Sequence, residues 1–171
     1  MNRSLIILAF LFPVLILMQV LIFNHIMLFN LAVPFVFIYF IVRFPIGVSG
    51  SWAITFAFIM GLIVDIFSDT LGVNALACTI LAGVKPSVFY AYVPRDDKTK
   101  NIVPTISSVG WQNYSKYLIT LTTIFCLLEF GIEYFSYASL QDIILMAVAS
   151  SLLTFIVILG IDSLLPSDNQ Y

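Results

Sequence analysis

The sequence predicts an all-α integral membrane protein with six transmembrane helices and with both termini in the cytoplasm. Hydrophobic residues make up 61% of the 171 residues and charged residues only 9%, whereas a soluble domain carries about 25% charged residues. The mean hydropathy is +1.09. Because so few charges cannot cover a water-facing surface, we expect lipid to surround most of this chain.

A spanning helix needs about 20 mostly apolar residues. Six segments meet this description, and together they form a single transmembrane domain over residues 1–171: 5–23, 28–43, 50–67, 71–92, 115–136 and 141–163. The first segment is longer than the apolar region of a signal peptide, about 7–15 residues, and no small-residue cleavage site follows it. We therefore expect it to be an uncleaved first span.

The connections between these segments carry polar residues and helix breakers. Residues 43–47 contain a charge, a proline and a glycine, residues 68–70 form a short polar turn, and residues 136–139 join the last two spans. The longest connection is a loop at about 94–114, which leaves no room for a soluble domain.

The basic residues predict the orientation. With the N-terminus inside, all seven fall in or beside the cytoplasmic tail and loops: Arg3, Arg43, Lys85, Arg95, Lys98, Lys100 and Lys116. The positive-inside rule relies on this bias. Lys85 lies within the fourth span, near its inner end, and we expect its ammonium group to snorkel to the interface. The chain is thus expected to be a multi-pass membrane protein.

Small residues recur every four positions along the third span, at Ala53, Ala57 and Gly61, and lead to Asp65. Residues at this spacing share one helix face, and small residues allow membrane helices to approach closely. This face therefore predicts packing within the six-helix bundle or, as an alternative, a groove for the membrane helix of a partner protein.

Carboxylates gather at the predicted outer end of the molecule, where Asp65, Glu129 and Glu133 form a candidate polar cluster. Acidic residues within membrane segments are costly and mark candidate functional sites. A cation site or proton relay is one interpretation. We favour hydrogen bonds that lock the helix ends, or a polar contact with a partner.

The sequence contains no phosphate-binding loop, nucleophile elbow or HExxH motif, so we expect no enzyme activity and no cofactor. Cys78 and Cys126 lie in apolar segments without metal-ligand spacing and are interpreted as packing residues. We therefore expect no metal site, and the charge pattern does not indicate nucleic-acid binding.

The segment Gly-Leu-Ile-Val-Asp-Ile-Phe-Ser-Asp at 61–69, followed by Leu-Gly-Val-Asn-Ala-Leu at 71–76, resembles the signature of the rod shape-determining MreD family. The resemblance implies that Gly61, Asp65, Asp69 and Gly72 shape a corner between the third and fourth spans. Gly61 would allow close packing, Asp65 would accept hydrogen bonds from the turn or from backbone N–H groups near Gly72, and Gly72 would permit a tight turn.

The same resemblance implies a role as a non-enzymatic scaffold in bacterial cell elongation and peptidoglycan synthesis. The expected partners are an MreC-like bitopic membrane protein, MreB filaments, RodA and a class B penicillin-binding protein. It also implies a fold similar to the membrane substrate-binding components of energy-coupling-factor transporters. Two alternatives stay open: a component that binds a vitamin-like solute, and a proton- or cation-coupled carrier that uses Asp65, Glu129 and Glu133.

Overall fold

The computed structural model describes residues 3–25, 32–95, 102–135 and 138–164, and these residues form helices without a sheet. Within these described ranges, seven α-helices and two short 3₁₀ turns follow one another: α1 (Arg3–Leu21), η1 (Phe23–His25), η2 (Val36–Ile38), α2 (Tyr39–Arg43), α3 (Gly50–Ser68), α4 (Val73–Tyr92), α5 (Ile106–Val109), α6 (Trp111–Glu133) and α7 (Leu140–Leu164). The all-α expectation is confirmed for these residues.

Four of the described helices, α3, α4, α6 and α7, are long and apolar enough to cross a membrane. They correspond to the third to sixth predicted spans, with ends shifted by a few residues. The first predicted span forms α1, which carries a shorter apolar stretch at Phe10–Leu21. The expectation of six regular spanning helices is therefore met only in part.

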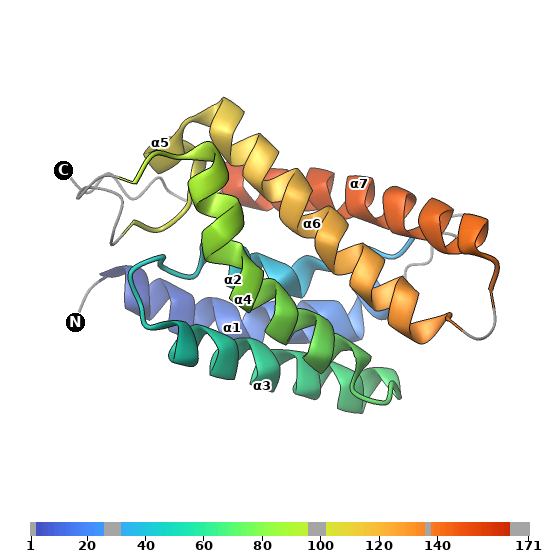
Figure 1. Cartoon of the computed structure of the whole chain (residues 1–171). Coiled ribbons are helices and arrows are strands. Elements are labelled where there is room, and N and C mark those ends of the chain that lie inside the picture. Colours follow the sequence, from blue (N-terminus) through green and yellow to red (C-terminus); the bar gives the residue numbers. More distant parts are fainter. Residues whose placement is uncertain (1–2, 26–31, 96–101, 136–137, 165–171) are drawn as a thin grey trace.

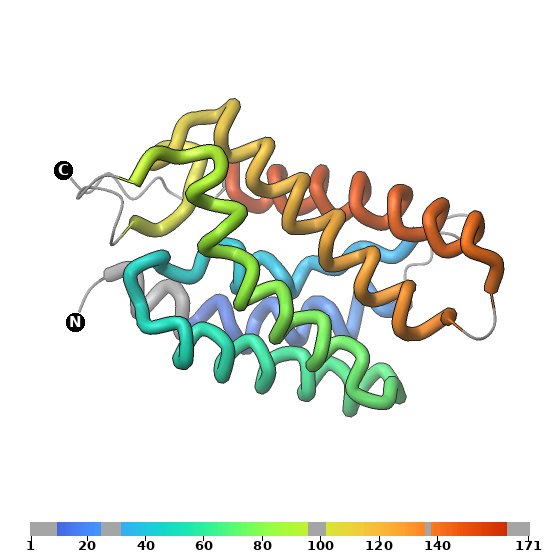
Figure 2. Tube along the Cα trace, in the orientation of Figure 1, coloured from blue at the N-terminus to red at the C-terminus, as the bar shows by residue number. Residues whose placement is uncertain are grey.

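The long helices pack in a continuous series, α3 along α4, α4 against α6 and α6 against α7 (Figures 1 and 2). Helix α1 packs on α3 and on the segment of η2 and α2. The start of α1 and the end of α7 lie at the same end of the molecule (Figure 1), as an even number of crossings requires.

The predicted helix over 28–43 is wrong for the residues that the structure describes there. Residues 33–35 have no regular structure, Val36–Ile38 form a 3₁₀ turn, and only Tyr39–Arg43 are α-helical; residues 28–31 lie outside the described residues. Pro34 has no N–H for a helical hydrogen bond, and it disfavours helical geometry at the residue before it. The proline therefore interrupts this segment within an otherwise apolar run.

Polar side chains from other helices satisfy the backbone of the interrupted segment. Gln19 of α1 accepts from the Val36 N–H at 2.8 Å and donates to the Pro34 carbonyl at 3.1 Å. The hydroxyls of Ser150 and Thr154 on α7 each accept a backbone N–H at 3.0 Å, from Val33 and Phe35. Irregular backbone at membrane depth is tolerated only where protein or water satisfies it, so these three side chains make the interruption possible.

The predicted loop at 94–114 is also shorter than expected. Helix α5 forms at Ile106–Val109, capped by Thr105, whose hydroxyl accepts the Ser108 N–H. Helix α6 then begins at Trp111 rather than at residue 115 and ends at Glu133 rather than at 136.

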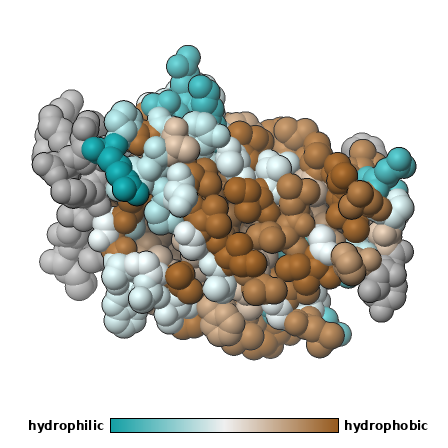
Figure 3. Space-filling view, viewed as in Figure 1, coloured by the Kyte–Doolittle hydropathy of each residue, from teal (hydrophilic) through white to brown (hydrophobic). Residues whose placement is uncertain are grey.

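The surface supports a membrane location. Hydrophobic residues cover the middle of the face shown in Figure 3, and hydrophilic residues lie toward its two ends. Large apolar side chains are exposed on the outer faces of the long helices, including Phe56, Ile59, Ile66, Leu145, Leu152 and Ile156. Lipid tails are the solvent that such a band requires.

Buried polar groups tie the segments together at the end that carries the described basic residues. Asp162 of α7 accepts from the Tyr39 hydroxyl at 2.5 Å, and its carboxylate lies 3.9 Å from the Arg43 guanidinium. Lys85 does not snorkel to the surface: it is only 3% exposed and donates to the carbonyl of Phe44. The chain leaves helical geometry at Phe44, which frees this carbonyl for the ammonium group.

Candidate functional site

The segment that resembles the MreD signature forms the corner between α3 and α4. Helix α3 ends at Ser68, and Asp69 follows in the left-handed region with φ of 58°. Gly72 has φ of +83° and precedes the first residue of α4. Two left-handed residues within four positions turn the chain back sharply, and glycine adopts this conformation without a steric penalty.

The Asp65 carboxylate caps the start of α4 from the neighbouring helix. It is 2% exposed and accepts the Asn74 N–H at 3.0 Å and the Ala75 N–H at 2.8 Å. The Thr70 hydroxyl donates to it at 2.5 Å, and the Asn74 amide donates at 3.1 Å. The first N–H groups of a helix have no partner within that helix, so Asp65 supplies a charged acceptor where α4 needs one. The hydrogen bonds expected from the sequence are present.

Gly61 lies one turn before Asp65 and brings the two backbones together. A Cβ atom at this position would stand 2.5 Å from the Asn74 carbonyl oxygen and 2.6 Å from Ala75 Cα. Both obstacles are backbone atoms, so a side chain here would force α4 to move as a whole. The close crossing of α3 and α4 therefore depends on the absence of a side chain at Gly61.

The small-residue stripe is used inside the molecule. Ala57 is 1% exposed and Gly61 is buried, whereas Ala53 is half-buried and packs at the edge of the core. Of the two interpretations offered by the sequence, packing within the bundle accounts for Ala57 and Gly61.

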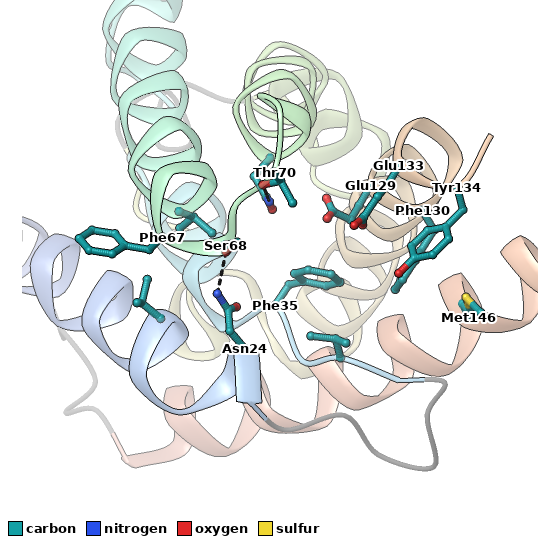
Figure 4. Close-up of a pocket in the computed structure, with 14 residues that line it drawn as sticks. Asn24, Phe35, Phe67, Ser68, Thr70, Glu129, Phe130, Glu133, Tyr134 and Met146 are labelled. Atoms are coloured by element: carbon teal, nitrogen blue, oxygen red, sulfur yellow. Dashed lines mark hydrogen bonds between the residues drawn. The ribbon is translucent and has the colours of Figure 1, made fainter. Parts of the chain in front are cut away.

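A cavity of about 420 Å³ lies beside this corner, at the end opposite the buried Arg43–Asp162 pair. Its walls come from α1, η1, the interrupted segment, the α3–α4 corner, α6 and α7 (Figure 4): Val20, Asn24, Val33, Phe35, Val64, Phe67, Ser68, Thr70, Asn74, Glu129, Phe130, Glu133, Tyr134 and Met146. Two of the three carboxylates in the predicted outer cluster thus share one cavity. Asp65 does not line it but binds two residues that do, Thr70 and Asn74.

Glu129 is the least satisfied acidic residue of this site. It is 3% exposed, and its Oε2 atom has no hydrogen-bond partner among the described residues; the same holds for Oδ1 of Asn74. Glu133, one turn later on α6, is half-buried. Burial, together with the carboxylates of Glu133 and Glu129, raises the pKa of the Tyr134 phenol above its ordinary value, so this hydroxyl stays protonated at the rim.

Asn24 connects the cavity to the interrupted segment. Its amide donates to the Ser68 hydroxyl at 2.7 Å and its carbonyl accepts from Gln19 at 3.0 Å. The sequence analysis missed Gln19, Asn24 and Thr154. A glutamine in the middle of an apolar first span was the available signal, because a lone amide at membrane depth requires a partner.

Within the described residues, no group of three or more His, Cys, Asp and Glu side chains is arranged to hold a metal ion. Both cysteines are free and buried. Comparisons of the chain with protein-family models, with curated proteins and with solved structures found no match.

Proposed function

We propose that this chain is a non-enzymatic membrane scaffold of the bacterial cell-elongation machinery and that it binds an MreC-like bitopic protein in the inner membrane. MreB, RodA and a class B penicillin-binding protein would be the further members of that assembly. The proposal starts from the resemblance of residues 61–76 to the MreD signature.

The observation that best supports the proposal is the set of hydrogen bonds that the Asp65 carboxylate accepts. Four donors from the turn and from the start of α4 converge on its carboxylate, and Gly61 lets α4 approach closely enough for them to reach it. An acid occupied in this way stabilises a fixed arrangement of helices. This use favours a scaffold over a carrier, since a carrier needs acids that exchange their cation or proton.

The test is deletion of the gene in a rod-shaped host, followed by complementation. Loss of the protein should round the cells, and the wild-type chain should restore rods. It should also copurify with the MreC-like protein from detergent extracts. Complementation with Gly61→Ala should be weaker than with Gly83→Ala, where a Cβ atom meets nothing within 4 Å. Normal shape after a clean deletion, together with no copurification, would overturn the proposal.

One observation favours a second candidate, the binding component of a small-solute transporter. A cavity of about 420 Å³ lies in the range of about 300–1,000 Å³ that small-molecule sites occupy. Uptake of a vitamin-like solute that depends on this chain, with high-affinity binding to the purified protein, would establish that function in place of the scaffold.

A further inference from the structure

The cavity beside the α3–α4 corner is lined by polar and by aromatic residues. The polar residues include Asn74, Glu129 and Glu133, and the aromatic ones include Phe35 and Phe130. Figure 4 shows the Glu129 and Glu133 side chains directed from α6 toward the turn at Thr70. A ligand that fills this space therefore meets acceptors and aromatic faces together.

Three of the side-chain donors around the cavity are engaged within the protein itself. The amide of Asn24 donates to Ser68, the Thr70 hydroxyl donates to Asp65, and the Asn74 amide donates to Asp65 and Thr70. The groups left without a partner, Oε2 of Glu129 and Oδ1 of Asn74, are both acceptors. Since an unsatisfied buried acceptor destabilises the protein, and more so when it is charged, a donor would stabilise these atoms.

The charge at the cavity points the same way. Two carboxylates one helical turn apart line it, and none of its described lining residues is Lys, Arg or His. Buried acids are normally paired. Two described basic residues have such partners, but they lie at the opposite end: Arg43 is near Asp162, and Lys85 donates to the Phe44 carbonyl. The described part of the chain supplies no positive charge beside Glu129, so a ligand that carries one would fit this position.

We propose that the cavity is a binding site for a small organic cation, a primary ammonium group carried on an apolar or aromatic body. The ammonium group has three donors and no acceptor, which matches Glu129, Asn74 and Glu133. The body of the ligand packs against Phe35, Phe130 and Met146, and aromatic faces add a cation–π attraction. This inference is independent of the scaffold proposal.

The experiment measures binding to the purified full-length protein in detergent by isothermal titration calorimetry and thermal shift. The probe is 2-phenylethylammonium, with neutral 2-phenylethanol and anionic phenylacetate as matched probes of similar shape. The ammonium should bind and raise the melting temperature, the alcohol should bind at least about tenfold more weakly, and phenylacetate should not bind.

Glu129→Gln should weaken ammonium binding at least about tenfold, because truncation of a buried charge pair has effects of this size or larger. The matched control is Asp69→Asn, which makes the same chemical change at an exposed position outside the cavity. If Glu129→Gln fails to fold, two other variants test the proposal. Glu133→Gln removes a charge at the rim of the cavity, and Met146→Trp fills part of the cavity. Each should weaken binding.

Nanodiscs distinguish a free amine from an amine on a lipid headgroup. Competition with 2-phenylethylammonium by phosphatidylethanolamine in a phosphatidylglycerol bilayer would identify the lipid as the source of the ammonium group, and absence of competition would identify a free amine. The proposal fails if no ammonium probe binds the wild-type protein, if the alcohol binds as well as the ammonium, or if the cavity variants bind as well as Asp69→Asn. Cell shape tests the scaffold, so the two proposals fail separately.

Discussion

Replacement of Gly61 by alanine adds one methyl group at the closest crossing of α3 and α4. The new Cβ atom would lie 2.5 Å from the Asn74 carbonyl oxygen, 2.6 Å from Ala75 Cα and 2.7 Å from Ala75 N. Comfortable carbon contacts begin at about 3.5 Å, so the start of α4 must retreat by roughly 1 Å. The same movement pulls Ala75 N away from the Asp65 carboxylate, which it now contacts at 2.8 Å.

The two effects set the expected magnitude. Over-packing of a tight core costs about 1–3 kcal/mol, and a hydrogen bond to a charged group contributes about 1.5–3 kcal/mol. Alanine recovers about 0.5–1 kcal/mol through its better helix propensity. Because the two losses share one movement and are not additive, we expect Gly61→Ala to lower the free energy of unfolding by about 2–4 kcal/mol.

The assay is unfolding of the purified protein in mixed detergent micelles, followed by circular dichroism and by the fluorescence of Trp52 and Trp111. Gly83→Ala is the control, because it makes the same change within helix α4 where a Cβ atom meets nothing within 4 Å. This control should be neutral or stabilising by up to about 1 kcal/mol. If Gly61→Ala unfolds at or above the midpoint of the control, the close crossing does not limit stability and the reasoning is wrong.

Three further substitutions test other contacts by the same unfolding assay. Asp65→Ala leaves the Asn74 and Ala75 N–H groups buried without their acceptor and should cost about 2–6 kcal/mol, from about 1–3 kcal/mol for each group. Asp142→Ala at the exposed start of α7 should cost only about 1 kcal/mol, and similar losses in the two variants would contradict the capping role of Asp65. Gln19→Leu removes the acceptor of the Val36 N–H and the donor to the Pro34 carbonyl and should cost about 2–4 kcal/mol, with faster amide exchange at Val36; unchanged exchange there would contradict the assignment. Asp69→Gly should stabilise by up to about 1 kcal/mol, because the left-handed region strains residues other than glycine; a clear loss would instead reveal a role for the Asp69 side chain.

The corner could be anticipated because its chemistry is local in sequence. Asp65 finds its partners five to ten positions later, at Thr70, Asn74 and Ala75, and Gly61 contacts the same short stretch. Over such a distance a helix, a polar turn and a second helix leave few arrangements, so the corner that the resemblance implied could form from this short stretch alone. The role of Gly72 follows from its position at the start of α4.

The interrupted second span could not be placed in the same way. Its backbone is satisfied by Gln19 from one helix and by Ser150 and Thr154 from a helix more than 100 positions away. Hydropathy identifies the apolar run at 28–43, but it does not indicate which groups accept the hydrogen bonds of its backbone N–H groups. Pro34 was the local warning, since it cannot continue a helical hydrogen-bond ladder. The position of Lys85 was missed for a related reason, because its partner is a carbonyl freed where α2 ends.

The carboxylates near the cavity could be placed from the sequence, but their roles depend on the contacts that each makes in the fold. The sequence placed Asp65, Glu129 and Glu133 at one end of the molecule through the bias of the basic residues, but their separate roles depend on neighbours that only the fold supplies. Asp65 meets four donors, whereas Glu129 is buried with an oxygen that has no partner in the described residues. Two carboxylates of similar intrinsic acidity thus differ in whether the fold provides hydrogen bonds that offset their burial.

For Asp65, hydrogen bonds within the folded protein offset the desolvation of the carboxylate, so replacing this residue should lower the stability of the protein. For Glu129, the described residues leave Oε2 without a partner, so we expect its replacement by glutamine to relieve the free protein while weakening binding there. We therefore expect Asp65→Asn to lower the unfolding midpoint and Glu129→Gln to raise it. Opposite signs in the unfolding assay would separate a structural acid from a binding acid even while the ligand is unidentified, and a loss of stability in both variants would place Glu129 among the structural acids instead.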